Sequence, residues 1–400
     1  MSLFESASLV VTPNGTKASK LYAIKPTDGS GDLTVTRATT ARRVNSAGLI
    51  ESVATNVPRL DYTNSTCPSI LVEPQSTNVL TYSEQFGTSW VNNGATIISN
   101  DTTAPDGNLT ADRLTATGGA FGVVKFSTWS ATNKVASCFV KANTSNLFRI
   151  ANVSGGGGSV TFNLSTQAIT ATTGFTGSIE ALPNGWFRCV AIDTLARSGT
   201  FSIGVTAVSE SVYIWGAQLE AGSYATSYIP TTTASVTRNT DIILKNSISS
   251  LIGQTEGTIF YDGFFGDTPN QVFLYLQQTG STGVDNSMYL QKESSSTSIY
   301  WNVFNGSTRQ VQIGGGAYSI GTRIKIAAVY KLNDFVMYIN GVQVGIIDTS
   351  GTPPTCGNLT FSAYGGDPTL VDFIANKGCK MVALWKERLT NAQLAELTTI

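Results

Sequence analysis

The sequence predicts an all-β protein with two β-sandwich domains, preceded by a small N-terminal β-rich segment. Only 13% of the 400 residues are charged, against about 25% in an average domain, and 39 residues are glycine. Apolar side chains recur at every second position in short runs, and these runs end at Gly, Pro, Asn or Asp, which is typical of strands joined by turns. A chain of this length is long enough for two or three domains, each with its own core.

Residues 1–62 are predicted to form a small segment that anchors the protein to a partner. Strand candidates lie near Leu9, Lys20 and Leu33, and turn-forming sequences separate them. The segment has too few apolar positions for an independent core, and basic residues outnumber acidic ones in it. We therefore expect it to become ordered mainly against a neighbouring subunit or a larger particle.

Residues 63–242 are predicted to form the first sandwich. Strand-like runs alternate with turn clusters along this region at the spacing of a sandwich. Phe201, Ile203 and Val205 alternate with small or polar residues, which indicates a half-buried strand. The glycine-rich sequence at 154–159 lies between two such runs and predicts a hairpin loop rather than a linker between domains.

Residues 243–400 are predicted to form the second sandwich. Asn340-Gly341 is the preferred dipeptide of a type I′ hairpin turn, and alternating apolar positions flank it on both sides. Near the end of the chain, Thr390 can cap a short helix and Gln393 can complete a capping box. The order of hairpin, later strand and short helix resembles that of laminin-G-like or concanavalin-like sandwiches.

The residue types that most enzymes use are scarce in this chain. It contains no histidine, which excludes Ser-His-Asp and Cys-His nucleophilic systems and removes the commonest transition-metal ligand. The 26 acidic residues show no spacing that indicates a glycosidase pair. Asp101, Asp106 and Asp112 could supply oxygen ligands for Ca²⁺, but turn formation already explains Asp106. We therefore expect no enzymatic activity, no metal and no cofactor.

Charge and cysteine usage limit the partners and the redox state. With 25 basic and 26 acidic residues, the chain has no overall field that would attract nucleic acid. No apolar run approaches the roughly 20 residues that cross a bilayer, and the first residues lack the pattern of a signal peptide, so we expect a soluble protein. The five cysteines form no C-x-x-C pair, and we expect free thiols, with Cys138 and Cys189 buried in strands.

Three segments carry a resemblance to a known family. They are TTARRVNSAGLIESVATNVPRLDY at 39–62, CPSILVEPQSTNVLTYSEQF at 67–86 and WGAQLEAGSYATSYIPTT at 215–232. In this order they resemble the fibre-like virion proteins of tailed bacteriophages. The last segment looks like the final strand and exit linker of a jelly roll of the family 4/9 carbohydrate-binding-module type. The family pattern has a Thr before a single Arg where this chain has Arg42-Arg43.

The resemblance implies a structural protein of the virion, a head or tail fibre, that displays its sandwiches for adhesion to host-surface glycans. It also implies a homotrimer that binds other virion proteins. Arg42 and Arg43 are candidate attachment residues, or else part of a solvated basic surface. Trp129, Tyr300 and Trp301 are candidate carbohydrate contacts, because they lie near loops or on the polar side of a strand and flat rings stack on sugars.

Two alternatives to an adhesive fibre stay open from the sequence. The first is a purely architectural capsid decoration protein that binds no glycan. The second is a polysaccharide-degrading enzyme, which the missing histidine and the unpaired acidic residues disfavour.

Overall fold

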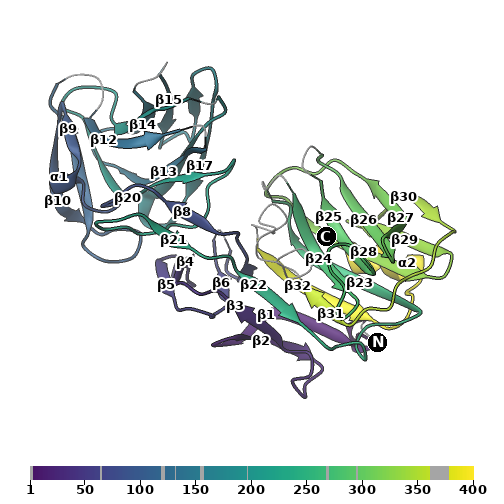
Figure 1. The fold of residues 1–400 in the computed structure, drawn as a ribbon. Helices are drawn as coiled ribbons and strands as arrows, with labels where there is room; N and C mark the ends of the chain where they lie inside the picture. The colour runs from purple at the N-terminus through teal and green to yellow at the C-terminus, as the bar shows by residue number, and fades with distance from the viewer. Residues whose placement is uncertain are drawn as a thin grey trace.

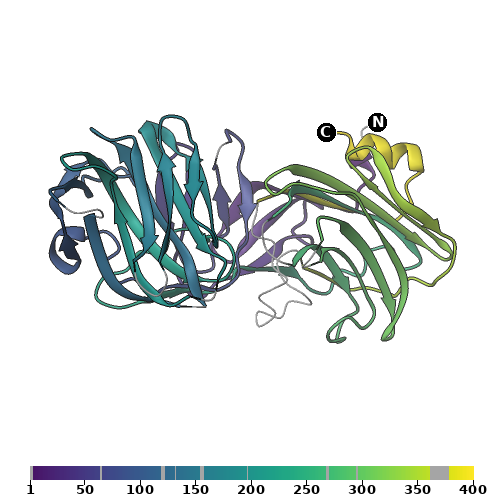
Figure 2. The same ribbon diagram turned by 90° about the horizontal axis from the view of Figure 1, so that it is seen from above.

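The chain folds into two β-sandwich lobes that lie side by side (Figure 1). The structure is a computed structural model, and it describes residues 3–63, 65–118, 122–130, 132–153, 157–195, 197–266, 270–293, 296–360 and 378–400. Seen from above, both ends of the chain lie at the same lobe (Figure 2). No helix among the described residues is both long enough and apolar enough to cross a membrane.

The first sandwich consists of two six-stranded antiparallel sheets. One sheet has the order β10 (Ala95–Thr102), β11 (Ala111–Ala116), β20 (Ser211–Ala221), β13 (Asn133–Ala142), β18 (Trp186–Asp193) and β17 (Phe175–Ala181). The other has the order β16 (Ile169–Ala171), β15 (Gly158–Asn163), β14 (Leu147–Asn152), β19 (Gly199–Gly204), β12 (Gly122–Trp129) and β9 (Val91–Asn93). Successive strands from β11 to β14, and again from β18 to β20, alternate between the two sheets, as in a jelly roll. The predicted jelly roll is therefore confirmed.

The core of the first sandwich lies between these two sheets. Trp90, which follows the short helix α1 (Phe86–Ser89), packs its ring against Phe86 and Phe201 at one end of the core. Cys138 on β13 and Cys189 on β18 are directly opposite each other, and both thiols are buried and free. This confirms the prediction that both cysteines are core residues within strands.

The second sandwich is formed by one long antiparallel sheet that folds over on itself. Its order is β27 (Thr308–Gly315), β26 (Ile299–Asn305), β25 (Ser287–Lys292), β24 (Gln271–Gln277), β31 (Asn358–Thr360), β22 (Ile242–Lys245), β3 (Leu33–Thr36), β2 (Lys20–Lys25), β1 (Leu9–Lys17), β32 (Cys379–Trp385), β23 (Glu256–Phe264), β28 (Arg323–Lys331), β29 (Asp334–Ile339) and β30 (Val342–Asp348). The end strands β27 and β30 lie close together, with Gly345 against Ile313, so the sheet nearly closes around one core.

The N-terminal strands belong to this second sandwich. β1 pairs with β32, with Leu9 opposite Leu384, and β3 pairs with β22. The side chains of Leu9 and Leu33 are fully buried in the same core as the C-terminal strands. These strands were expected to become ordered against a neighbouring subunit, but the edges of this chain's own C-terminal strands order them instead.

The remaining elements connect the two lobes or cover their edges. They are the 3-10 helices η1 (Leu3–Glu5) and η2 (Pro183–Gly185), the hairpin β4 (Ala41–Val44) and β5 (Ile50–Val53), the pair β6 (Arg59–Asp61) and β7 (Ser69–Leu71), the pair β8 (Ser76–Asn78) and β21 (Val236–Arg238), and the helix α2 (Asn391–Thr398). The pair β6 and β7 joins the second sandwich through β32. Figure 1 places β4, β5, β6, β8 and β21 between the two lobes.

Two local predictions in the second sandwich are confirmed. The turn between β29 and β30 has Asn340 at φ 51° and Gly341 at φ 83°, as a type I′ turn requires. At the start of α2, Thr390 Oγ1 accepts a hydrogen bond from Gln393 N at 3.3 Å, and Gln393 Oε1 accepts one from Thr390 N at 2.8 Å. This is the predicted capping box.

Candidate functional site

Two of the three aromatic residues expected to bind carbohydrate are core residues. The ring of Trp129 is 5.8 Å from Phe175 and stacks on Phe201 at 6.2 Å, and Trp301 lies in the core of the second sandwich. Both side chains are 0% exposed, so neither can stack on a sugar. The expected exposure of these two rings is wrong, because both rings point to the inner faces of their sheets. Tyr300 is half-buried and packs over Gly314 on the neighbouring strand β27.

The candidate attachment residues Arg42 and Arg43 lie on β4. The guanidinium group of Arg43 pairs with Glu51 on β5 at 2.7 Å, within the hairpin. The hairpin turn contacts the first sandwich at Pro183, where a side chain at Gly48 would collide with the proline ring. Arg43 therefore has a partner inside its own hairpin, and a role of either arginine in attachment stays a prediction.

The first two segments of the family resemblance contribute Arg59 and Glu73 to a buried cluster between the two lobes, and Ser227 of the third segment contacts both residues. This junction cluster consists of Arg37, Arg59, Glu73, Arg238 and Asp241, all at most 8% exposed. Asp241 pairs with Arg37 at 2.7 Å and also with Arg59. Glu73 pairs with Arg59 at 2.7 Å and with Arg238 at 3.5 Å. These residues come from β6, β21 and the connections next to β3, β7 and β22, so the cluster joins distant parts of the chain.

The electrostatics of the junction cluster hold the carboxylate of Glu73 in the charged form. Burial by itself would raise the pKa of Glu73, but the guanidinium groups of Arg238 and Arg59 and hydrogen bonds from Ser227 outweigh burial and lower this pKa to about 2. Ser227 donates to Glu73 through its backbone N at 2.7 Å and its hydroxyl at 2.6 Å. The cluster is enclosed by protein, which indicates a structural role.

Polar residues of the third segment satisfy the backbone of the linker that leaves β20. Gln218 Oε1 accepts a hydrogen bond from Ile229 N at 2.7 Å, and Glu220 accepts one from Thr226 N at 2.9 Å. Asn78 Nδ2, on β8, donates to the carbonyl oxygen of Ile229 at 2.9 Å. These contacts explain why buried positions in this segment are polar.

The three aspartates considered as Ca²⁺ ligands make separate contacts. Asp101 pairs with Arg113 at 3.1 Å, Asp106 accepts a hydrogen bond from Asn108 N at 3.0 Å, and Asp112 accepts one from Phe86 N at 3.1 Å. In the described part of the chain, no group of three or more His, Cys, Asp or Glu residues is placed to hold a metal ion.

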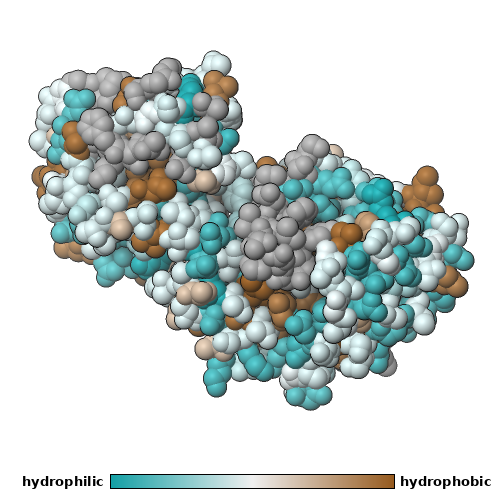
Figure 3. Space-filling model, in the orientation of Figure 1, coloured by the Kyte–Doolittle hydropathy of each residue, from teal (hydrophilic) through white to brown (hydrophobic). Residues whose placement is uncertain are grey.

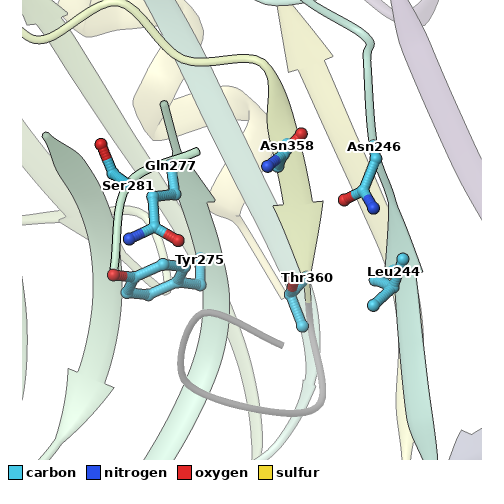
Figure 4. A pocket seen from close by; sticks show the side chains of 7 residues that line it. All are labelled: Leu244, Asn246, Tyr275, Gln277, Ser281, Asn358 and Thr360. Atoms are coloured by element: carbon cyan, nitrogen blue, oxygen red, sulfur yellow. The ribbon is translucent and has the colours of Figure 1, made fainter. Parts of the chain in front are cut away.

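A cavity on the second sandwich has the geometry of a small binding site (Figure 4). It has a volume of about 270 Å³ and lies over β22, β31 and β24. Leu359 and Ile243 point from these strands into the core, so the alternating neighbours Thr360 and Leu244 point outward to the cavity. Seven of the described residues line it: Leu244, Asn246, Tyr275, Gln277, Ser281, Asn358 and Thr360.

The cavity presents both hydrogen-bond donors and acceptors. Asn358 Oδ1 accepts hydrogen bonds from Thr279 Oγ1 and Ser247 N, both at 3.3 Å, which leaves its Nδ2 group without a partner among the described residues. Gln277 Nε2 donates to the carbonyl oxygen of Gly283 at 2.9 Å, while no described donor reaches its Oε1 atom. The exposed amide of Asn246 likewise has no partner in the described ranges.

Aromatic stacking and a short loop support one wall of the cavity. The ring of Tyr275 stacks on Tyr289 at 5.3 Å, and Tyr289 stacks on Phe304 at 6.1 Å. The hydroxyl of Tyr275 donates to the carbonyl oxygen of Gly283, in the loop 278–286. Asn286 holds the end of this loop, because its Nδ2 atom donates to Gln278 Oε1 at 2.7 Å. The wall is therefore fixed before any ligand binds.

The lining of the cavity suits recognition rather than acid-base chemistry. None of the seven described lining residues carries a charge at neutral pH. The lining consists of amides, hydroxyls, the aliphatic side chain of Leu244 and the aromatic ring of Tyr275. Sequence reasoning missed these residues, because single Asn, Gln and Thr residues at strand ends look like ordinary turn or surface residues. Only the pairing of β31 with β22 and β24 brings residues 244, 277 and 358 together.

No protein-family model and no curated protein matches the chain. Solved structures show a distant structural similarity to sialidase β-domains. The CBM40 domain of the Ruminococcus gnavus IT-sialidase bound to α2,3-sialyllactose has a TM-score of 0.32 and 12% identity, over 39% of this chain and 91% of that one. The NanB sialidase of Streptococcus pneumoniae has a TM-score of 0.31 and 14% identity, over 38% of this chain and 26% of that one. TM-scores of this size assign neither a family nor a function.

Proposed function

We propose that this protein is a structural component of a tailed-phage virion, a head or tail fibre, that displays its sandwiches for adhesion to host-surface glycans. The cavity between β22, β31 and β24 is the observation that carries the adhesive part. It combines uncharged amides and hydroxyls with the apolar side chains of Leu244 and Tyr275. Sugars present hydroxyl groups around a ring with apolar C–H faces, so such a lining complements them.

The surroundings of the cavity support glycan binding over docking of an apolar partner. Much of the visible surface of the second sandwich is hydrophilic, and apolar residues lie in small groups (Figure 3). Among the described residues, Tyr22 is the one aromatic side chain with a large exposed fraction, 38%, and it lies on β2 rather than at the cavity. Adhesion would therefore depend on hydrogen bonds more than on a broad aromatic platform.

The virion role is supported by the family resemblance of residues 39–62, 67–86 and 215–232. Residues of these segments take part in the junction cluster and in the contacts of the exit linker. The resemblance thus covers the part of the chain that joins the two lobes, and a fibre protein needs such a joint to present its domains in a fixed arrangement.

A purely architectural decoration protein is the second candidate. One observation favours it: residues of the family resemblance, such as Arg59 and Glu73, are engaged in contacts within the chain, which serve folding rather than ligand binding. A polysaccharide-degrading enzyme is the weaker candidate, because none of the described residues that line the cavity has a carboxylate that could donate or accept a proton.

Two measurements test the proposal. Electron microscopy of purified phage particles labelled with antibodies against this chain should show label on head or tail fibres, and unlabelled particles would exclude a virion component. The purified full-length chain should be retained by host-surface polysaccharide. Labelled particles without any retention would favour the architectural protein, and loss of polymer viscosity would indicate an enzyme.

A further inference from the structure

We infer that the cavity between β22, β31 and β24 selects uncharged sugars and excludes sugars that carry a carboxylate, sulfate or phosphate. This inference rests on the proposed glycan adhesion and specifies the class of ligand. It concerns one sugar ring, because 270 Å³ is below the roughly 300–1,000 Å³ of sites for drug-sized ligands. The remainder of the glycan would extend out of the cavity.

The charges around the cavity disfavour an anion. None of the seven lining residues is basic. Lys245, the nearest basic residue in the sequence of β22, follows Leu244, and successive side chains of a strand point to opposite faces. The charged residue of the loop 278–286 is acidic: it is Asp285, whose backbone carbonyl oxygen accepts a hydrogen bond from Gln277 Nε2 at 3.5 Å. An anionic group in this cavity would lose its hydration without gaining a cationic partner among the described lining residues.

The hydrogen-bonding groups of the cavity match neutral hydroxyls. Asn358 Nδ2 is a donor without a described partner, Gln277 Oε1 is an acceptor without one, and the Asn246 amide offers both. A sugar hydroxyl donates and accepts at the same time, so it can satisfy both kinds of group. A carboxylate only accepts, and it would leave Gln277 Oε1 facing another acceptor.

The local backbone positions Asn358 for this contact. Gly357 precedes it, and a side chain at Gly357 would lie 2.5 Å from the hydroxyl of Thr279. That hydroxyl donates to Asn358 Oδ1 at 3.3 Å, which turns the Nδ2 end of the amide away from Thr279. The glycine therefore lets β31 approach the loop closely enough for this orientation.

The test measures binding of the full-length chain to an array that holds each neutral glycan beside its sialylated and sulfated derivatives. The neutral glycan that is retained most strongly is then titrated calorimetrically. We expect retention of neutral glycans and at least about tenfold weaker binding of their acidic derivatives. Asn246→Asp and Asn358→Asp each exchange an amide for a carboxylate and should weaken neutral binding about five- to tenfold. Asn92→Asp makes the same exchange on exposed β9 of the other lobe and should leave binding unchanged.

The outcomes separate this inference from the proposed function. Preference for acidic glycans would overturn the inference while adhesion stands. Neutral binding that both cavity variants leave unchanged would place the site elsewhere and also overturn it. If no glycan is retained, the proposed adhesion fails and the inference falls with it. Asn246 makes no described contact, so Asn246→Asp keeps the test valid even if Asn358→Asp lowers the melting temperature.

Discussion

Replacing Glu73 by Gln should destabilise the protein through the junction cluster. Glutamine keeps the shape of the side chain, but one of the two oxygens that accept hydrogen bonds from Ser227 becomes an NH2 group, so the substitution removes the negative charge together with one acceptor. Three buried guanidinium groups, those of Arg37, Arg59 and Arg238, would then share the single carboxylate of Asp241. Breaking a buried ion pair from one side costs about 3 to 5 kcal/mol, because the charges that remain are left without compensation.

The pKa of Glu73 indicates a contribution of similar size to the free energy of unfolding. It falls from the ordinary 4.5 to about 2 in the folded protein, which corresponds to about 3 kcal/mol at 25 °C. Because the folded pKa is depressed, this stability is present above pH 4.5 and is lost as the pH falls through about 2. The stability difference between the native chain and Glu73→Gln should therefore narrow as the pH is lowered from 5 toward 2.

Urea unfolding followed by far-ultraviolet circular dichroism at several pH values measures both effects. Glu51→Gln is the matched control, because Glu51 also pairs with an arginine at 2.7 Å but its side chain is 35% exposed. The control should lose at most about 1 kcal/mol. If Glu73→Gln is as stable as the control at pH 7, or if its deficit does not depend on pH, the cluster does not contribute the stability assigned to it.

Three further predictions concern the two cores and the cap of helix α2. Cys138 and Cys189 should resist alkylation in the native protein and react after denaturation, because burial raises both thiol pKa values, that of Cys138 to about 12; fast native labelling would contradict their burial. Trp129→Ala and Trp301→Ala should each lower the free energy of unfolding by about 3 to 5 kcal/mol, and a change below 1 kcal/mol in urea titration would contradict the core assignment. Thr390→Ala should cost about 1 kcal/mol through loss of the capping box, and an unchanged melting temperature would refute this role of the cap.

Local features of the fold could be predicted from the sequence. The type I′ turn at Asn340-Gly341 and the cap at Thr390 depend only on residues close to them in the sequence, so a short stretch of sequence is enough to predict them. A short stretch of sequence could also have assigned Trp301 to the core, since Ile299 and Val303 lie on the same face of β26 and are both buried. Trp129 was harder to place, because a register shift before Thr128 interrupts the alternation of β12.

Contacts between distant segments could not be predicted in this way. The pairing of Leu9 with Leu384 depends on which strand edges are free after the other strands have paired, and no local pattern contains this information. The cavity has the same origin, because Asn246 and Asn358 become neighbours only through the pairing of β22 with β31. A buried arginine such as Arg59 also looks like a surface residue until its partners are known.

The pairing of β1 with β32 makes the first sandwich an insertion within the second. All strands of the jelly roll, from β9 to β20, lie in the chain between β7 and β22, which both belong to the sheet of the second sandwich. During synthesis all strands of the jelly roll are available once β20 has emerged from the ribosome. The edges of β1 and β23 stay unpaired until β32, at residues 379–385, has been synthesised. Domains generally fold as units while the chain is being made. The lobe that begins first in the sequence is thus the last to finish folding, and until then its N-terminal strands have an open edge.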